Sequence, residues 1–174
     1  MENPPSPPAS PAPLRADQSK FLFEIPKLDP TRPIHDREQI GTVIPHRGNM
    51  MLLDGILWYS DDFVRGVAVK HVRSDEFWCE GHFPDKALYP GVLQIESAAQ
   101  LAAYLYYRRY PDVGLSVFCK IEEATFRGMV GPGDELLLLC QDIRVSRRRF
   151  LCNVMGVTND KVTFQATILG MSLS

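Results

Sequence analysis

Long apolar runs, paired cysteines and an excess of positive charge are all missing from this sequence of 174 residues. No run of about 18 apolar residues is present to span a bilayer, and no charged start followed by a short apolar core marks an export signal. The four cysteines form no CxxC pair and no dense spacing, which disfavours a zinc knuckle or a disulfide framework. The net charge of -2 supplies no global positive field to attract nucleic acids or anionic membranes. We therefore expect a cytoplasmic protein without a membrane or nucleic-acid partner.

The composition is that of one globular domain preceded by a biased segment. With 45% hydrophobic and 23% charged residues, the chain can form one sizeable core. Residues 1–20 are rich in proline, serine and alanine, so we expect a disordered tail; a transit peptide is the alternative, disfavoured by the acidic residues Glu2 and Asp17. Residues 21–39 mix apolar anchors with prolines and predict an extended arm, leading into a short helix over residues 37–44. The folded domain is expected over residues 40–174.

The segment from Pro90 to Tyr110 is the clearest helix in the sequence. Apolar residues fall on nearly all of its faces, which is typical of a helix buried inside a fold. Long strand-like segments follow it, with breaks at residues 131–133, near residue 146 and at residues 159–160, and they predict a meander. A buried helix followed by long antiparallel strands predicts an α+β architecture in which the sheet wraps around the helix.

Two titratable residues stand close to the start of this helix. His82 lies in a loop punctuated by glycine and proline, and Glu96 lies about one and a half turns into the helix. A carboxyl between Ile95 and alanines is costly to ionise, which makes Glu96 a candidate proton donor, while a neutral histidine can accept a proton from a weakly acidic C–H group. The helix start at Pro90-Gly91 adds backbone N–H groups suited to a carbonyl oxygen that gathers negative charge. Residue types and spacing alone leave a structural alternative open, in which His82 is an ordinary loop residue and Glu96 pairs with an arginine.

Residues 81–100, with the sequence GHFPDKALYPGVLQIESAAQ, resemble the signature of the FabZ-type β-hydroxyacyl-acyl carrier protein dehydratases. Two further segments agree with that family in the correct order. Upstream are Ile44-Pro45-His46-Arg47 and Leu52-Leu53-Asp54; downstream are Ala124-Thr125-Phe126-Arg127 and the segment over residues 130–136. The resemblance covers roughly residues 40 to 172, and three ordered motifs are more specific than any single motif.

This resemblance implies a hotdog fold, in which an antiparallel sheet wraps a long central helix. It also implies a homodimer, assembled as a trimer of dimers, whose active sites combine His82 of one subunit with Glu96 of the other. In that family's chemistry His82 removes the α-proton, Glu96 protonates the departing hydroxyl, and the Gly91 amide holds the thioester oxygen. The Leu88 carbonyl orients the imidazole, and Gln100 supports Glu96. No cofactor or metal is implied, because the reaction needs only proton transfers and an oxyanion site.

The chain departs from the family pattern where the acyl chain would be lined. Gly48-Asn49-Met50 stands where Tyr-Pro-Phe is usual, and Ala87 and Tyr89 stand where Pro and Met are common. We therefore take Met50, Phe83 and Tyr89 as candidate substrate-contacting residues. Met51, Phe77, Trp78 and Phe118 are further candidates, and packing in the core is the alternative for the whole set.

A group of arginines forms a second candidate surface. Its members are Arg108, Arg109, Arg144, Arg147, Arg148 and Arg149. Such a group can meet the acidic face of a carrier protein, and the alternative is an ordinary solvated turn.

The sequence thus predicts dehydration of a (3R)-hydroxyacyl-acyl carrier protein to the trans-2-enoyl product in fatty acid biosynthesis, with acyl carrier protein as partner. A glutamate in the acid position resembles the dehydratase branch of the family and differs from the dehydratase/isomerase branch. Two alternatives stay open: a hotdog thioesterase that hydrolyses the acyl thioester, and a non-catalytic subunit that binds the acyl carrier.

Overall fold

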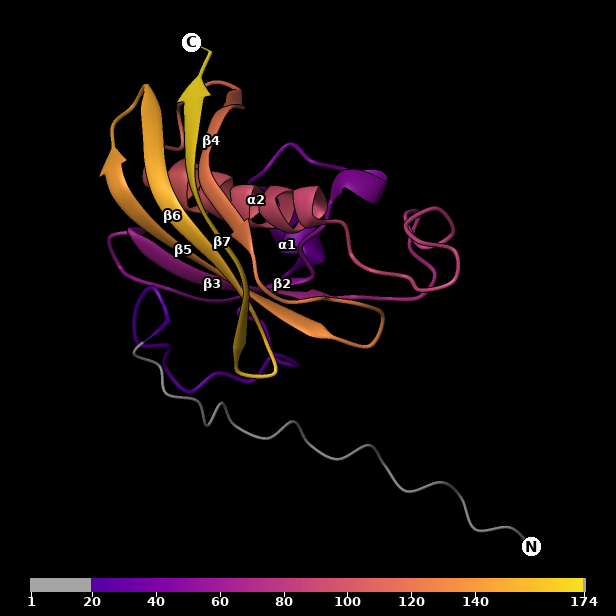
Figure 1. The fold of residues 1–174 in the computed structure, drawn as a ribbon. Helices are drawn as coiled ribbons and strands as arrows, with labels where there is room; N and C mark the ends of the chain where they lie inside the picture. Colours follow the sequence, from indigo (N-terminus) through magenta and orange to yellow (C-terminus); the bar gives the residue numbers. More distant parts are fainter. Residues whose placement is uncertain (1–19, 174) are drawn as a thin grey trace, which may run out of the picture.

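The structure is a computed structural model that describes residues 20–173, so the predicted tail lies outside the described residues except for Lys20. Figure 1 shows an antiparallel sheet curved around one long helix, α2 (Gly91–Arg109). The sheet has seven strands in the order β1-β2-β3-β5-β6-β7-β4. The strands are β1 (His35–Asp36), β2 (Gly55–Tyr59), β3 (Arg65–His71), β4 (Ser116–Phe126), β5 (Glu135–Val145), β6 (Arg149–Thr158) and β7 (Lys161–Ser172). This is the predicted α+β hotdog architecture.

Helix α2 forms the centre of the main core. It starts directly after Pro90, whose fixed φ suits a helix start, and it carries Arg108 and Arg109 in its last turn, where cations favour the helix dipole. Ala98 and Ala102 are buried, and small side chains of this kind let strands approach the helix closely. Among residues 20–173, no helix combines the length and the apolar character needed to cross a membrane.

The strands after the helix do not form the simple meander that the turn signals predicted. β5, β6 and β7 are consecutive neighbours, but β4 pairs with β7 at the far edge of the sheet, and β5 pairs with β3. The connection around Gly131-Pro132-Gly133 is therefore a crossover. Turn residues mark where a strand ends, and they do not indicate which strand the next segment pairs with.

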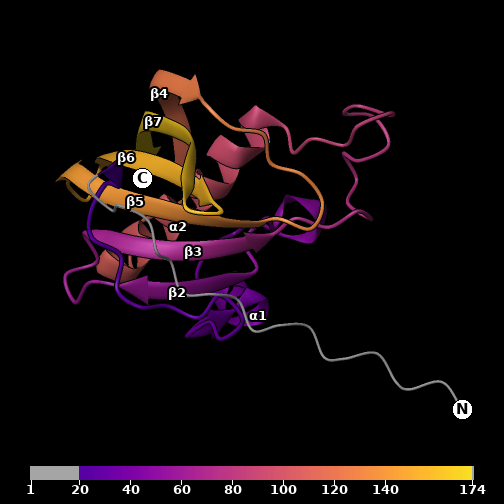
Figure 2. The same ribbon diagram turned by 60° about the horizontal axis from the view of Figure 1, so that its bottom comes forward.

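The segment before β2 covers the outer face of the sheet. Phe21, Phe23 and Ile25 are buried against side chains of β3 and β5 such as Val67 and Leu139, and Figure 2 shows this segment beside the strands. The chain then enters β1 at the sheet edge and the short helix α1 (Arg37–Gly41), which has a capping box between Asp36 and Gln39. α1 ends three residues earlier than predicted.

Candidate active site

His82 lies in the long loop between β3 and α2 and is fixed by backbone contacts. Its N–H donates to the Trp78 carbonyl over 2.9 Å, and its own carbonyl accepts from the Leu88 N–H over 3.0 Å. Its Nδ1 lies 2.8 Å from the Leu88 carbonyl oxygen. Because a carbonyl oxygen only accepts, Nδ1 carries the hydrogen and Nε2 of the neutral ring has a free lone pair. The His82 ring stacks on the Phe83 ring, with centroids 4.2 Å apart.

A buried ion pair holds the base of this loop. Lys70 of β3 is 1% exposed, and its Nζ donates to Glu76 Oε1 over 2.8 Å. Glu76 Oε2 accepts from the indole N–H of Trp78 over 3.3 Å, and Trp78 is buried against Tyr89. Since Trp78 is the residue that receives the His82 N–H, Lys70 and Glu76 connect the sheet to the position of the imidazole.

Glu96 points from α2 toward the segment that precedes β2, and its surroundings are more polar than the sequence predicted. Its side chain is 24% exposed. Oε1 accepts from Gln100 Nε2 over 2.9 Å and lies 3.3 Å from His46 Nε2. The expectation that Glu96 is enclosed by apolar side chains is therefore wrong, because the helix face that carries Glu96 meets the polar segment around His46 rather than the sheet.

Gln100 is fully buried and links Glu96 to this segment. Its amide donates to the Met50 carbonyl over 2.7 Å as well as to Glu96, and its Oε1 accepts from the Leu52 N–H over 3.0 Å. All three contacts agree on which end of the amide is oxygen, so the orientation of Gln100 is determined by its neighbours.

The first turn of α2 offers unpaired donors. Leu93 and Gln94 donate their N–H groups to the Pro90 carbonyl, whereas Gly91 and Val92 have no acceptor among the described residues. The Phe126 ring lies against Gly91, where a Cβ atom would stand 2.7 Å from Phe126 Cε1. Glycine at this position therefore lets an aromatic ring cover the helix start.

Comparison with known proteins places these features in a family. The family model described as FabA-like domain matches residues 44–167, which include His46, His82, Gly91, Glu96 and Phe126. The chain belongs to this family.

Relatives within the FabA-like family agree with the resemblance to FabZ-type dehydratases, which is confirmed. The chain is 40% identical over 109 residues to the 3-hydroxyacyl-(acyl-carrier-protein) dehydratase FabZ of Bacillus thuringiensis (strain Al Hakam), covering 62% of this chain and 75% of the relative. The same values hold for the protein of that name from Bacillus mycoides (strain KBAB4).

Solved structures with low sequence identity share the fold. The dehydratase heterocomplex ApeI:P from Xenorhabdus doucetiae superimposes with a TM-score of 0.67 at 16% identity, covering 78% of this chain and 91% of that chain. The TT0310 protein from Thermus thermophilus gives a TM-score of 0.54 at 18% identity, covering 74% and 100%. The hotdog fold of this FabA-like chain is thus found in proteins with little sequence similarity to it.

The candidate substrate-contacting residues divide into two groups. Tyr89 is 2% exposed, and its hydroxyl lies 2.8 Å from Ser97 Oγ. Burial raises the pKa of Tyr89 above its usual range, so its environment is that of a core residue. Met51 and Trp78 are likewise buried, while Met50, Phe77, Phe83 and Phe118 are exposed. The exposed group is available for contact with a substrate or a second subunit.

The two predicted catalytic residues share no polar or ring contact among the described residues of one chain. Among the described residues, the polar and ring contacts of His82 are with Trp78, Leu88 and Phe83, and those of Glu96 are with Gln100 and His46. His46 is a neighbour of Glu96 to which sequence reasoning gave no role. Its place in the Ile44-Pro45-His46-Arg47 motif was the available signal.

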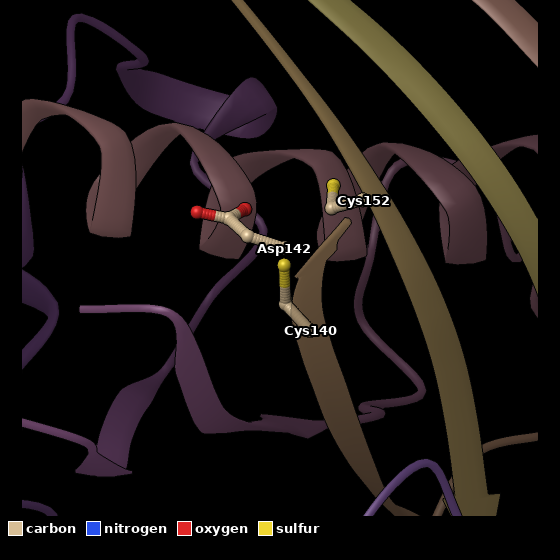
Figure 3. Close-up of side chains that lie close together, drawn as sticks. All are labelled: Cys140, Asp142 and Cys152. Atoms are coloured by element: carbon tan, nitrogen blue, oxygen red, sulfur yellow. The ribbon is translucent and has the colours of Figure 1, made fainter. Parts of the chain in front are cut away.

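A cluster of potential metal ligands lies elsewhere in this FabA-like domain. Cys140 and Asp142 of β5 and Cys152 of β6 have ligand atoms within 4.8 Å of one another, beside α2 (Figure 3). The Cys152 thiol and burial raise the pKa of Cys140 well above its usual value, whereas metal binding requires a thiolate. Asp142 faces Arg109, with Nη1 4.0 Å from Oδ2. The donor set is that of two buried core cysteines beside an acid that faces an arginine, and we assign it no metal.

Proposed function

We propose that the chain dehydrates 3-hydroxyacyl-acyl carrier protein to the trans-2-enoyl thioester in fatty acid biosynthesis, with His82 and Glu96 as its catalytic residues. The main structural support is the 2.8 Å contact between His82 Nδ1 and the Leu88 carbonyl, which leaves Nε2 available to act as a base. Membership of the FabA-like family and the FabZ relatives support the substrate class. The expectation of a cytoplasmic location stays a prediction.

The proposed reaction needs a base, an acid and an oxyanion site. His82 Nε2 removes the proton from C2 of the substrate, and the electrons of that C–H bond form the C2–C3 double bond. The Gly91 N–H stabilises the negative charge that gathers on the thioester oxygen. Glu96 donates its proton to the hydroxyl on C3, and the C3–O bond breaks to release water. His82 ends protonated and Glu96 ends ionised, and proton exchange with solvent restores both.

We propose further that the complete site forms in a homodimer from His82 of one subunit and Glu96 of the other. The support is twofold. Among the described residues, His82 and Glu96 share no polar or ring contact within one chain. β4 is an edge strand with exposed apolar residues, Phe118, Ile121 and Phe126. Edge strands with exposed apolar side chains are natural sites of pairing with a second chain. A trimer of dimers stays a prediction.

The experiment that tests the activity is reversible hydration of a crotonyl thioester, followed by loss of the conjugated absorbance. Wild-type protein should hydrate the substrate, and His82→Ala and Glu96→Gln should each lower kcat by at least about 100-fold, since general acid and base groups contribute on that order. Unchanged turnover in either variant contradicts the assignment. A thiol reagent in the same assay detects a thioesterase, because dehydration and hydration release no free thiol.

A further inference from the structure

His46 and Gln100 approach the same oxygen of Glu96. His46 Nε2 lies 3.3 Å and Gln100 Nε2 lies 2.9 Å from Oε1. Oε2 has no polar partner among the described residues, and the side chain is 24% exposed. The carboxyl is therefore held through one oxygen, and the other oxygen is free to face a substrate.

The segment that carries His46 is fixed at both ends. Arg47 Nη1 donates to the Ile44 carbonyl over 2.7 Å and to the His46 carbonyl over 2.6 Å. At the other end Gln100 binds the Met50 carbonyl and the Leu52 N–H. Arg47 thus directs its guanidinium to backbone carbonyls of its own segment, and His46 is the residue of this segment that faces the carboxyl.

The other ring nitrogen of His46 indicates which tautomer is present. Nδ1 is buried and has no hydrogen-bond partner within residues 20–173. With hydrogen on Nδ1, the ring would bury an unpaired N–H group and also turn the Nε2 lone pair toward a carboxyl oxygen; with hydrogen on Nε2, only the Nδ1 lone pair is left unpaired. The tautomer with hydrogen on Nε2 fits this site, and it directs a donor toward Glu96 Oε1.

We propose that His46 is a positioning residue for Glu96, acting with Gln100 to hold Oε1 so that Oε2 carries the proton given to the substrate hydroxyl. This inference rests on the dehydratase function proposed above. When Oε2 releases its proton, negative charge spreads over both oxygens, and two donors already at Oε1 stabilise the ionised product. The 3.3 Å contact shortens as that charge develops, as contacts of this kind commonly do in reacting complexes.

The test compares two replacements of His46 in the crotonyl thioester assay. His46→Phe keeps a ring but removes the donor, and we expect kcat to fall roughly 10- to 100-fold with KM changed less than about threefold, as for the loss of a group that orients a reacting residue. His46→Gln returns an N–H donor near the position of Nε2, and its kcat should lie within about fivefold of wild type. The matched control is His71→Phe, because His71 of β3 pairs with Glu135 of β5; its kcat should stay within about twofold of wild type.

Equal losses of kcat in His46→Phe and His46→Gln would show that His46 only packs against the helix, and an unchanged kcat in His46→Phe also overturns the proposal. Circular dichroism and melting temperature establish that each variant is folded. If wild-type protein fails to hydrate the substrate, the proposed function fails instead. The contact itself is then tested by nitrogen-15 NMR of His46: hydrogen on Nε2, with signals that shift in Glu96→Gln, supports it, and hydrogen on Nδ1 overturns it.

Discussion

At the scale of single residues, the proposed chemistry depends on which side-chain atoms are already hydrogen-bonded. His82 has Nδ1 committed to the Leu88 carbonyl, and Glu96 has Oε1 committed to Gln100, so the free atoms are Nε2 of one and Oε2 of the other. The family signature predicted both residues and named Gln100 as the support of Glu96, but it gave no role to His46 beside the carboxyl. His46 is separated from Glu96 by 50 positions, and its motif indicates the family without indicating which side chain it contacts.

Gly91 gives a prediction at this scale. We expect Gly91→Ala to lower kcat by roughly 10-fold or more, because its new Cβ would stand 2.7 Å from the Phe126 ring and displace either the ring or the helix start. Gly91→Ala combined with Phe126→Leu should recover part of the loss. Gly41→Ala is the control, since its Cβ meets only ordinary contacts; a Gly91→Ala enzyme as active as this control refutes the tight packing.

Asp142 gives a pH-dependent prediction. Burial raises the pKa of its carboxyl to about 7 from 3.8, and the cation of Arg109 opposes this. Between these two values the folded protein keeps a proton that the unfolded chain has released, so this group's contribution to stability falls as pH rises from about 4 to 7. Asp142→Asn should remove that fall and stabilise the protein at pH 8 by on the order of 2 to 4 kcal/mol. The melting temperatures of wild type and Asp142→Asn are measured from pH 4.5 to 8. If the two curves run parallel, the raised pKa of Asp142 is refuted.

At the scale of elements, the periodicity of the sequence predicted the helix but not the order of the strands. Helix α2 was predicted correctly because Pro90 marks its start and its apolar residues allow only a buried position. The order of the strands was not predicted correctly. β4 pairs with β7, a strand more than 35 residues further along the chain, and strand pairing over that distance depends on the whole sheet. The Lys70–Glu76 pair was also missed, since a lysine in a strand is usually solvent-exposed.

The Lys70–Glu76 pair gives a prediction for the loop that carries His82. Lys70→Met removes an ammonium group that lies 2.8 Å from Glu76 and 3.6 Å from Asp54. Glu76 keeps two N–H donors in its largely buried position but loses its lysine partner, and we expect a loss of about 3 kcal/mol in the free energy of unfolding together with a lower kcat. Replacing both residues, as Lys70→Met with Glu76→Gln, should restore part of the stability because Glu76 no longer carries a charge and Asp54 keeps two arginine partners. Denaturant unfolding measures the effect. A double variant less stable than Lys70→Met alone contradicts the assigned role of the pair.

At the scale of the whole molecule, the proposed homodimer requires a single chain to present half of each site. The sheet wraps α2 on one side, and the apolar edge of β4 and the exposed Phe83, Val92 and Met129 are left on the surface. A second copy of the chain would cover such a surface and bring its own Glu96 toward His82. The family resemblance predicted this sharing, whereas composition and spacing do not encode the arrangement of two subunits.

Mixing two inactive variants tests this account most directly. His82→Ala and Glu96→Gln homodimers should each be inactive in the hydration assay. When the two are mixed and allowed to exchange subunits, heterodimers contain one site with both wild-type residues, and about a quarter of wild-type activity should return at equal amounts. If His82 and Glu96 act within one chain, no heterodimer contains an intact site, and a mixture that stays inactive despite demonstrated subunit exchange contradicts the shared site.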